Sequence, residues 1–160
     1  MPAGRTLAEW LSYQQALHPQ SIDLGLERVR VVADRLGLRP PAGRVAVVGG
    51  TNGKGSTAAL LAALVQAHGA RTGLFTSPHL LRYHERVRVD GAEPDDAQLC
   101  AAFGQIEAAR GAESLTYFEF NTLAALLLFR ASAVEVSVLE VGLGGRLDAT
   151  NIIDADVSVL

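Results

Sequence analysis

Residues 45–60, VAVVGGTNGKGSTAAL, contain the features that decide the fold of this chain. Four apolar, mostly β-branched residues are typical of a buried strand. Two glycines and TNGKGS follow, and then a run of alanines and leucines that favours a helix. A strand, a glycine loop and a helix form the geometry that holds phosphate, because backbone N–H groups and the positive end of the helix dipole face the anion. Lys54 adds a full positive charge, and Ser56 and Thr57 offer hydroxyl groups that could bind Mg²⁺.

The loop departs from the common P-loop pattern G-x-x-x-x-G-K-[ST]. Val48 stands where the first glycine belongs, and Gly55 separates Lys54 from Ser56. An ordinary glycine turn between strand and helix is the alternative, but it leaves the lysine between two glycines without a packing purpose. A dinucleotide-binding G-x-G-x-x-G loop fits poorly, since no properly spaced glycine triplet follows the strand.

The rest of the chain alternates between helical and strand patterns, which favours a doubly wound α/β fold with a mainly parallel sheet. The alternating residues 86–89 could form one further short strand. We expect helices over 7–17, 24–36, 55–68, 95–110 and 118–131, and strands over 45–48, 71–77, 134–142 and 156–160.

Composition is that of a globular domain. The chain has 160 residues, 49% of them hydrophobic and 19% charged, with a formal charge of −3. No basic block indicates nucleic-acid binding, and no apolar run reaches the roughly 20 residues of a membrane span. The single cysteine, Cys100, excludes an internal disulfide and is predicted to be a packing residue on a helix. The absence of a secretory signal pattern favours the cytoplasm.

Glu140 ends the strand over 134–142 and precedes a second glycine loop. Ligands of doubly wound sheets bind at the carboxyl ends of the strands. A buried carboxylate there is costly unless a positive group faces it, and Mg²⁺ would be such a group. The alternative is a surface acid at the end of a strand.

Four further segments complete the pattern. Together with residues 49–56, the segments SIDLGLERV (21–29), TSPHLLRYHERVRVDG (76–91), TYFEFNTLAALLLF (116–129) and EVGLGGRLDATNIID (140–154) resemble consecutive motifs of the dihydrofolate synthase/folylpolyglutamate synthase family. The departure from the common P-loop resembles the variant of the wider muramyl-ligase superfamily.

The resemblance implies an ATP-dependent ligase. It would join L-glutamate to dihydropteroate and extend the γ-glutamyl tails of folates through an acyl-phosphate intermediate. It also implies the residues of the site. ATP would be bound by Asn52, Gly53, Lys54, Gly55 and Ser56, with Lys54 also catalytic; Mg²⁺ would be bound by Ser77 and Glu140; the pterin would be bound by Ser21, Ile22, Asp23, Leu24, Thr116, Tyr117, Phe118, Glu119, Leu147, Asp148 and Ala149.

Several of these residues also have purely structural interpretations. Phe118 could belong to the core, Asp23 could cap the following helix, Asp148 could hold its loop, and Ser77 could cap a turn. His79 and His84 are not expected to be catalytic. The remaining candidates, Arg82, Arg86 and Arg88, could meet the glutamate tail or the phosphates, but we expect them to form a solvated face.

Members of the resembled family are longer and carry a second, C-terminal domain. The chain ends within a predicted strand, so we expect residues 1–160 to be an incomplete N-terminal ATP-binding domain that lacks turnover alone. The complete protein is expected to be a monomer without nucleic-acid or membrane partners. The alternatives are a muramyl-type amino-acid ligase of cell-wall synthesis and a nucleotide-binding module without catalysis.

Overall fold

The computed structural model describes residues 4–20, 23–41 and 43–160. Its centre is a five-stranded sheet with the order β3-β2-β4-β1-β5. Every neighbouring pair is parallel except β2 and β3, which are antiparallel. The strands are β1 (Arg44–Val48), β2 (Thr72–Phe75), β3 (Val87–Val89), β4 (Val136–Glu140) and β5 (Val157–Val159). The predicted α/β fold with a mainly parallel sheet is confirmed, including the short strand within residues 86–89.

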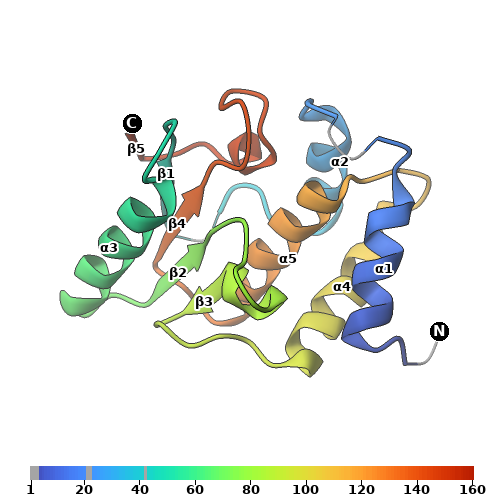
Figure 1. Cartoon of the computed structure of the whole chain (residues 1–160), viewed down its shortest axis with the longest axis horizontal. Helices are drawn as coiled ribbons and strands as arrows, with labels where there is room; N and C mark the ends of the chain where they lie inside the picture. The colour runs from blue at the N-terminus through green and yellow to red at the C-terminus, as the bar shows by residue number, and fades with distance from the viewer. Residues whose placement is uncertain (1–3, 21–22, 42) are drawn as a thin grey trace.

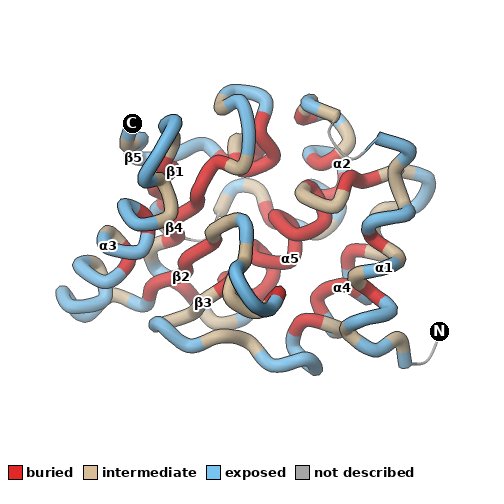
Figure 2. The backbone as a smooth tube through the Cα atoms, in the orientation of Figure 1, coloured by how far each residue is buried: buried red, intermediate tan, exposed pale blue. Residues whose placement is uncertain are grey.

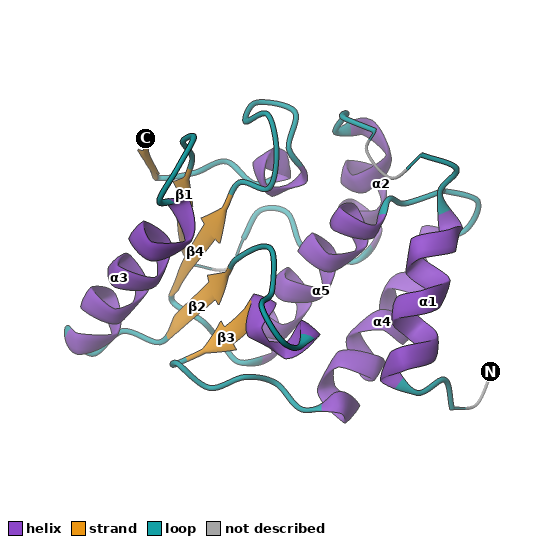
Figure 3. Ribbon diagram, in the orientation of Figure 1, coloured by secondary structure: helices purple, strands orange, loops and turns teal. Residues whose placement is uncertain are grey.

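Helices cover both faces of this sheet (Figure 1). One face carries α3, and the other carries α5, which is backed by α4, α1 and α2. Two short 3₁₀ helices, η1 and η2, lie within the long connections seen as loops in Figure 3. The helix bounds are α1 (Leu7–Leu17), α2 (Glu27–Arg35), α3 (Lys54–Ala67), α4 (Asp96–Arg110), α5 (Tyr117–Ala131), η1 (Tyr83–Arg86) and η2 (Ala149–Ile152).

Reciprocal capping explains where three of the helices begin. Thr6, Asp95 and Thr116 each accept a hydrogen bond from the backbone N–H three residues later, whose side chain bonds back. The predicted start of α2 at residue 24 is wrong by three residues. Residues 23–25 stay outside the helix, and Leu26 occupies the N-cap without a side-chain hydrogen bond.

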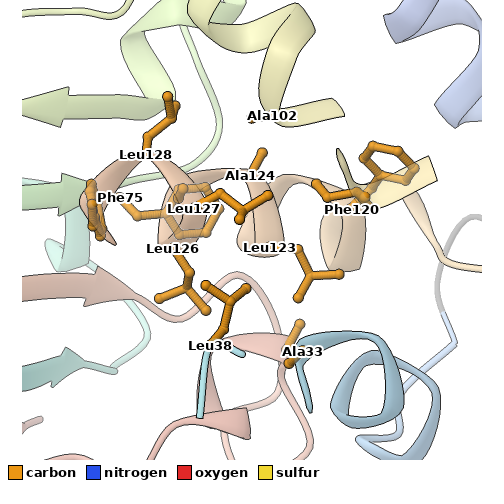
Figure 4. Packing of buried hydrophobic residues seen from close by; sticks show 14 of the residues in the cluster. Ala33, Leu38, Phe75, Ala102, Phe120, Leu123, Ala124, Leu126, Leu127 and Leu128 are labelled. Atoms are coloured by element: carbon orange, nitrogen blue, oxygen red, sulfur yellow. The ribbon is translucent and has the colours of Figure 1, made fainter. Parts of the chain in front are cut away.

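The alternation of β1 divides the core into two parts. Val45 and Val47 pack into the large cluster beneath α5, while Ala46 and Val48 pack with Ala58 of α3 on the other face. The α5 helix is buried along most of its length (Figure 2). Its leucines and phenylalanines interdigitate with residues from both neighbouring layers (Figure 4). Because both faces of the sheet are covered by helices, the central strands are continuous runs of apolar residues.

Cys100 lies on α4 and packs, half-buried, against the large core cluster. Burial raises the pKa of its thiol above the ordinary value. Since the thiolate is the nucleophilic form, these facts support the prediction of a packing role. Within the described residues, no helix has both the length and the apolar character needed to cross a membrane.

Glycine is required in β2 by the close approach of α5. A Cβ atom at Gly73 would lie 2.6 Å from the Phe129 ring, whereas a Cβ atom at Gly104 on α4 would meet nothing within 4 Å. The two glycines therefore differ in the space around them although both lie in regular elements.

We expect Gly73→Ala to lower the free energy of unfolding by about 1–3 kcal/mol, because the buried ring must shift. Gly104→Ala should raise it by up to about 1 kcal/mol, because alanine is the better helix former and the site is open. Urea unfolding of the two variants checks both signs. Equal stabilities would contradict the observed packing of α5 on β2.

Candidate functional site

The phosphate loop connects β1 to α3 at the carboxyl edge of the sheet. Gly50 and Gly53 have φ angles of 130° and 76°, which side chains other than glycine rarely adopt. Helix α3 begins directly at Lys54, so its free N–H groups lie at the end of the loop. Lys54 is the chain's single lysine, and its Nζ lies 3.0 Å from the carbonyl oxygen of Gly50. The loop thus combines backbone donors, a helix N-terminus and one ammonium group.

A cavity of about 600 Å³ opens beside this loop. Of the five predicted ATP-binding residues, Lys54 lines this cavity, Asn52 and Gly53 lie exposed at the tip of the loop, and Ser56 is exposed on α3. The remaining lining residues are Val47, Gly49, Gly50, Thr51, Val141, Gly142, Leu143, Gly144, Gly145, Arg146, Asn151, Ser158 and Leu160.

Glu140 is the last residue of β4 and is buried, with 4% of its surface exposed. Its Oε2 accepts a hydrogen bond of 2.8 Å from the backbone N–H of Ser77. The two predicted metal ligands are therefore adjacent, and the interpretation of Glu140 as a surface acid is wrong. Within the described ranges, no arginine, lysine or histidine forms an ion pair with Glu140, and no group of three acidic, histidine or cysteine side chains gathers to hold a metal alone. One unpaired buried carboxylate beside a hydroxyl suits Mg²⁺, which usually takes few protein ligands and completes its shell with water and phosphate oxygens.

Gly55, which separates Lys54 from Ser56, lies beside the carboxylate of Glu140. A Cβ atom at Gly55 would lie 3.5 and 3.6 Å from the two carboxylate oxygens of Glu140. Glycine at this position leaves the space between the start of α3 and that carboxylate open.

A second cavity, of about 240 Å³, brings together all three segments predicted to bind the pterin. Asp23 and Leu24 line it, whereas Ser21 and Ile22 lie outside the described residues. The full lining is Asp23, Leu24, Gly25, Ser77, Pro78, Arg86, Thr116, Tyr117, Phe118, Glu119, Gly142, Leu143, Leu147, Asp148 and Ala149.

Phe118 serves both the core and this cavity. Its ring centroid lies 5.7 Å from that of Phe75, and the ring also lines the cavity. A Cβ atom at Gly142 would lie 2.5 Å from the ring. The absence of a side chain at residue 142 therefore allows the aromatic ring to approach the loop after β4.

Most carboxylates around the cavity are already engaged. Arg28 donates to Asp23 at 2.6 Å and to Glu119 at 3.2 Å, which links two of the three segments. Asp23 therefore pairs with Arg28, and the interpretation of Asp23 as a helix cap is wrong, since α2 begins only at Glu27. Thr116 and Glu119 also form the capping box of α5.

Asp148 holds the third segment in place. Its carboxylate accepts hydrogen bonds from the backbone N–H groups of Leu143 and Thr150 and from the Thr150 hydroxyl, at 2.7–3.0 Å. The interpretation of Asp148 as a loop-holding residue is confirmed. This does not remove it from the site, because it lines the cavity as well.

The prediction that three arginines form a solvated face holds for Arg82 and Arg88, which pair with Glu93 near the surface. It is wrong for Arg86, of which only 8% is exposed and which lines the cavity. Its Nε donates to Nδ1 of His79 at 2.8 Å. Sequence reasoning missed both residues as parts of this site, because the alternation around Arg86 resembles a strand with one solvated face.

The two cavities share Gly142 and Leu143, so a single stretch of the loop after β4 forms a wall of each. Ser77 lines the smaller cavity and bonds to Glu140, while Lys54 lines the larger one. The arrangement can therefore hold two ligands in adjoining cavities, and the carboxylate of Glu140 bonds to Ser77 in the wall of the smaller one.

Burial, with a smaller contribution from Arg86, lowers the pKa of His79 below its ordinary value. The unfolded chain then takes up a proton at His79 at a higher pH than the folded chain does, so this histidine lowers stability as the pH falls below about 6.5. His79→Gln keeps an acceptor for Arg86 but cannot be protonated.

We expect the free energy of unfolding of His79→Gln, relative to that of the unsubstituted chain, to increase as the pH falls from about 7.5 to about 5.5, which means that the variant gains relative stability. Urea unfolding at both pH values checks this, with His68→Gln at the exposed end of α3 as the control. A relative stability of His79→Gln that does not change with pH would contradict the lowered pKa of this half-buried ring.

Comparison with known proteins identifies similar sequences. No family model matches the chain. The dihydrofolate synthase/folylpolyglutamate synthase of Escherichia coli K12 is 56% identical over 158 residues, which is 99% of this chain and 37% of that protein. The corresponding enzyme of Haemophilus influenzae is 51% identical over 160 residues, which is 36% of its length. The chain thus spans little more than a third of the relatives it matches.

Comparison with solved structures finds the same similarity. The E. coli FolC structure in complex with DHPP and ADP is 56% identical, has a TM-score of 0.95 and is matched over 98% of this chain and 38% of its own. A bifunctional folylpolyglutamate synthase/dihydrofolate synthase with Mn, AMPPNP and L-glutamate bound has a TM-score of 0.92 at 56% identity, with the same coverage of both chains. In sequence and fold, this chain is similar to the N-terminal portion of proteins named dihydrofolate synthase/folylpolyglutamate synthase.

Proposed function

We propose that the protein containing this chain is an ATP-dependent ligase that joins L-glutamate to dihydropteroate and extends the γ-glutamyl tails of folates. The observation that carries the proposal is the shared wall at Gly142 and Leu143 between the cavity at the phosphate loop and the smaller, partly aromatic cavity. A phosphoryl group can pass between two substrates only if their reacting ends meet. Two cavities that share lining residues are close enough to support this requirement. A cytoplasmic location accompanies this proposal.

The phosphate side of the reaction is assigned to the loop and the start of α3. The N–H groups of residues 52–56 and the Lys54 ammonium would bind the phosphates of ATP, and the ammonium would stabilise negative charge that develops during transfer. Ser77 and Glu140 would hold Mg²⁺ between them. When bound, this ion would neutralise charge on the phosphate oxygens.

The pterin side is assigned to the smaller cavity. A flat heterocycle with donors and acceptors around its edge suits a cavity with one aromatic wall and a few polar groups. Phe118 would pack against the ring, while Asp148 and the backbone of residues 147–149 lie where they could bond to its edge. Asp23, Leu24 and residues 116–119 would close the other sides.

The chemistry needs two displacements. A carboxylate oxygen of the pterin substrate attacks the γ-phosphorus of ATP, the bond to the β-phosphate oxygen breaks, and ADP and an acyl phosphate result. The uncharged amine of L-glutamate then attacks the acyl carbon and displaces phosphate, and the amine proton is released. Both steps require the reacting carboxyl carbon to be held near the candidate Mg²⁺ site and to be shielded from water.

Lys54→Ala should weaken the binding of MgATP to this chain by about 10- to 100-fold, since it removes a charge-assisted hydrogen bond. Lys54→Arg, which keeps the charge, is the matched variant and should lose less. Isothermal titration of MgATP into the three proteins gives the comparison. Undiminished binding by Lys54→Ala would remove the loop from the nucleotide site.

Glu140→Gln should abolish the gain in ATP affinity that Mg²⁺ provides, while affinity measured with EDTA stays within about twofold, because the carboxylate acts through the metal. Glu135→Gln is the control, since Glu135 lies just before the opposite end of β4. The same titration with and without Mg²⁺ tests this. A metal-dependent gain that survives in Glu140→Gln would exclude Glu140 as a ligand.

A further inference from the structure

Arg86 is the one cationic side chain among the described residues that line the smaller cavity. Only 8% of its surface is exposed. Arg86 is the last residue of η1 and directly precedes β3. A guanidinium group keeps its charge in any folded protein, so its burial requires a partner of opposite charge or several acceptors. The partners that Arg86 has are therefore informative.

The described residues satisfy only part of the hydrogen-bonding capacity of this guanidinium group. Nε donates to His79 at 2.8 Å, and the described residues provide neither a hydrogen bond to the two Nη atoms nor a carboxylate within the distance of an ion pair. The rings of Tyr117 and Tyr83 lie 5.5 and 6.0 Å from the guanidinium carbon. Aromatic faces offset part of the cost of burial, but they leave the Nη donors without acceptors.

The nearby carboxylates form other interactions and do not pair with Arg86. Asp23 and Glu119 are paired with Arg28, and Asp148 is bonded within its own loop. Glu85, on the same 3₁₀ helix, accepts from the backbone N–H groups of residues 80–82. The acids around the cavity are therefore committed, and the free donors of Arg86 remain for a ligand.

His79 fixes the orientation of this group. Nδ1 of His79 accepts a hydrogen bond of 2.8 Å from Nε of Arg86, so this ring nitrogen carries no proton in the structure. With Nε held, the planar guanidinium has one defined direction for its two Nη donors. Such a fork matches the two oxygens of a carboxylate.

The backbone of Arg86 lies beside the metal-ligand candidates. Its carbonyl oxygen accepts from the N–H of Thr76, which precedes Ser77, and Ser77 bonds to Glu140. Arg86 and Ser77 line the same cavity. An anion held by Arg86 would therefore share the cavity with Ser77, whose backbone bonds to Glu140.

We propose that Arg86, oriented by His79, binds the carboxylate of the pterin substrate that becomes phosphorylated. This inference rests on the proposed function, since it assigns a role within the proposed pterin cavity. It predicts that the chain selects ligands by that carboxylate, apart from any recognition of the pterin ring. It makes Arg86 a binding residue and His79 a positioning residue.

The experiment compares pteroate with its neutral, nearly isosteric carboxamide, by titration into this chain with MgADP present. The unsubstituted chain should bind pteroate about 10- to 100-fold more tightly than the carboxamide. Arg86→Gln should reduce that preference to about twofold or less while leaving the affinity for the carboxamide nearly unchanged. Arg86→Lys should keep part of the preference, and His79→Phe should weaken it, whereas His79→Gln should preserve most of it.

Arg88→Gln is the matched control, because Arg88 lies on the neighbouring strand and pairs with Glu93 at the surface. It should leave both affinities unchanged. Circular dichroism melts of all variants show whether each is folded, and Arg86→Lys replaces Arg86→Gln in the comparison if the latter does not fold.

Each other outcome overturns the proposal in a distinct way. Equal binding of pteroate and carboxamide by the unsubstituted chain refutes the role of Arg86 and leaves the proposed function standing. No binding of either ligand removes the pterin cavity, and the inference fails with it. An equal loss of both affinities in a folded Arg86→Gln assigns Arg86 to structure alone. A parallel titration of pteroylglutamate tests the glutamate tail, and a loss in Arg86→Gln that is confined to this ligand, with pteroate unaffected, contradicts the assignment.

Discussion

The buried carboxylate of Glu140 is the constraint around which the site is organised. It ends a central parallel strand, bonds to the backbone of Ser77 after the neighbouring strand, and faces the open side of Gly55 at the start of α3. Because β1, β2 and β4 are parallel, the loops that follow them leave the same edge of the sheet. The phosphate loop, the Ser77 loop and the loop after β4 therefore converge on one negative charge. A Cβ atom at Gly55 of the unusual loop sequence would lie within van der Waals contact of that charge.

The smaller cavity is held together by hydrogen bonds and ion pairs between its segments. Its three segments come from distant parts of the chain, and Arg28 links two of them through its bonds to Asp23 and Glu119, while Asp148 fixes the third. The charged groups of these segments are mainly structural, and the contact surface is left to Phe118, Tyr117 and the leucines of residues 24, 143 and 147. Polar residues in such a site can be essential without touching a ligand.

Sequence alone predicted the sheet, the five main helices and the phosphate loop, because each rests on local patterns: continuous apolar strands, caps and glycine turns. Ser77 was paired with Glu140 as a metal ligand only through the family resemblance, and the parallel pairing of β2 with β4 explains why the two residues lie side by side. The start of α2 could not be predicted, since Leu24 and Leu26 fit the apolar spacing of the residues that follow, whereas in the structure Leu24 and Gly25 line the smaller cavity and the helix begins only at Glu27. The burial of Arg86 also escaped prediction. Its neighbours alternate as in a strand with a solvated face, and only the η1 turn directs it inward.

The solitary ammonium side chain at Lys54 has a practical consequence. Amine-directed reagents such as succinimidyl esters have one side-chain target in these 160 residues, and it lies at the mouth of the larger cavity. Their modification of that group would report directly on whether the cavity is filled. A mass spectrum of the labelled chain could then serve as an occupancy assay, with no need to engineer a probe into the protein.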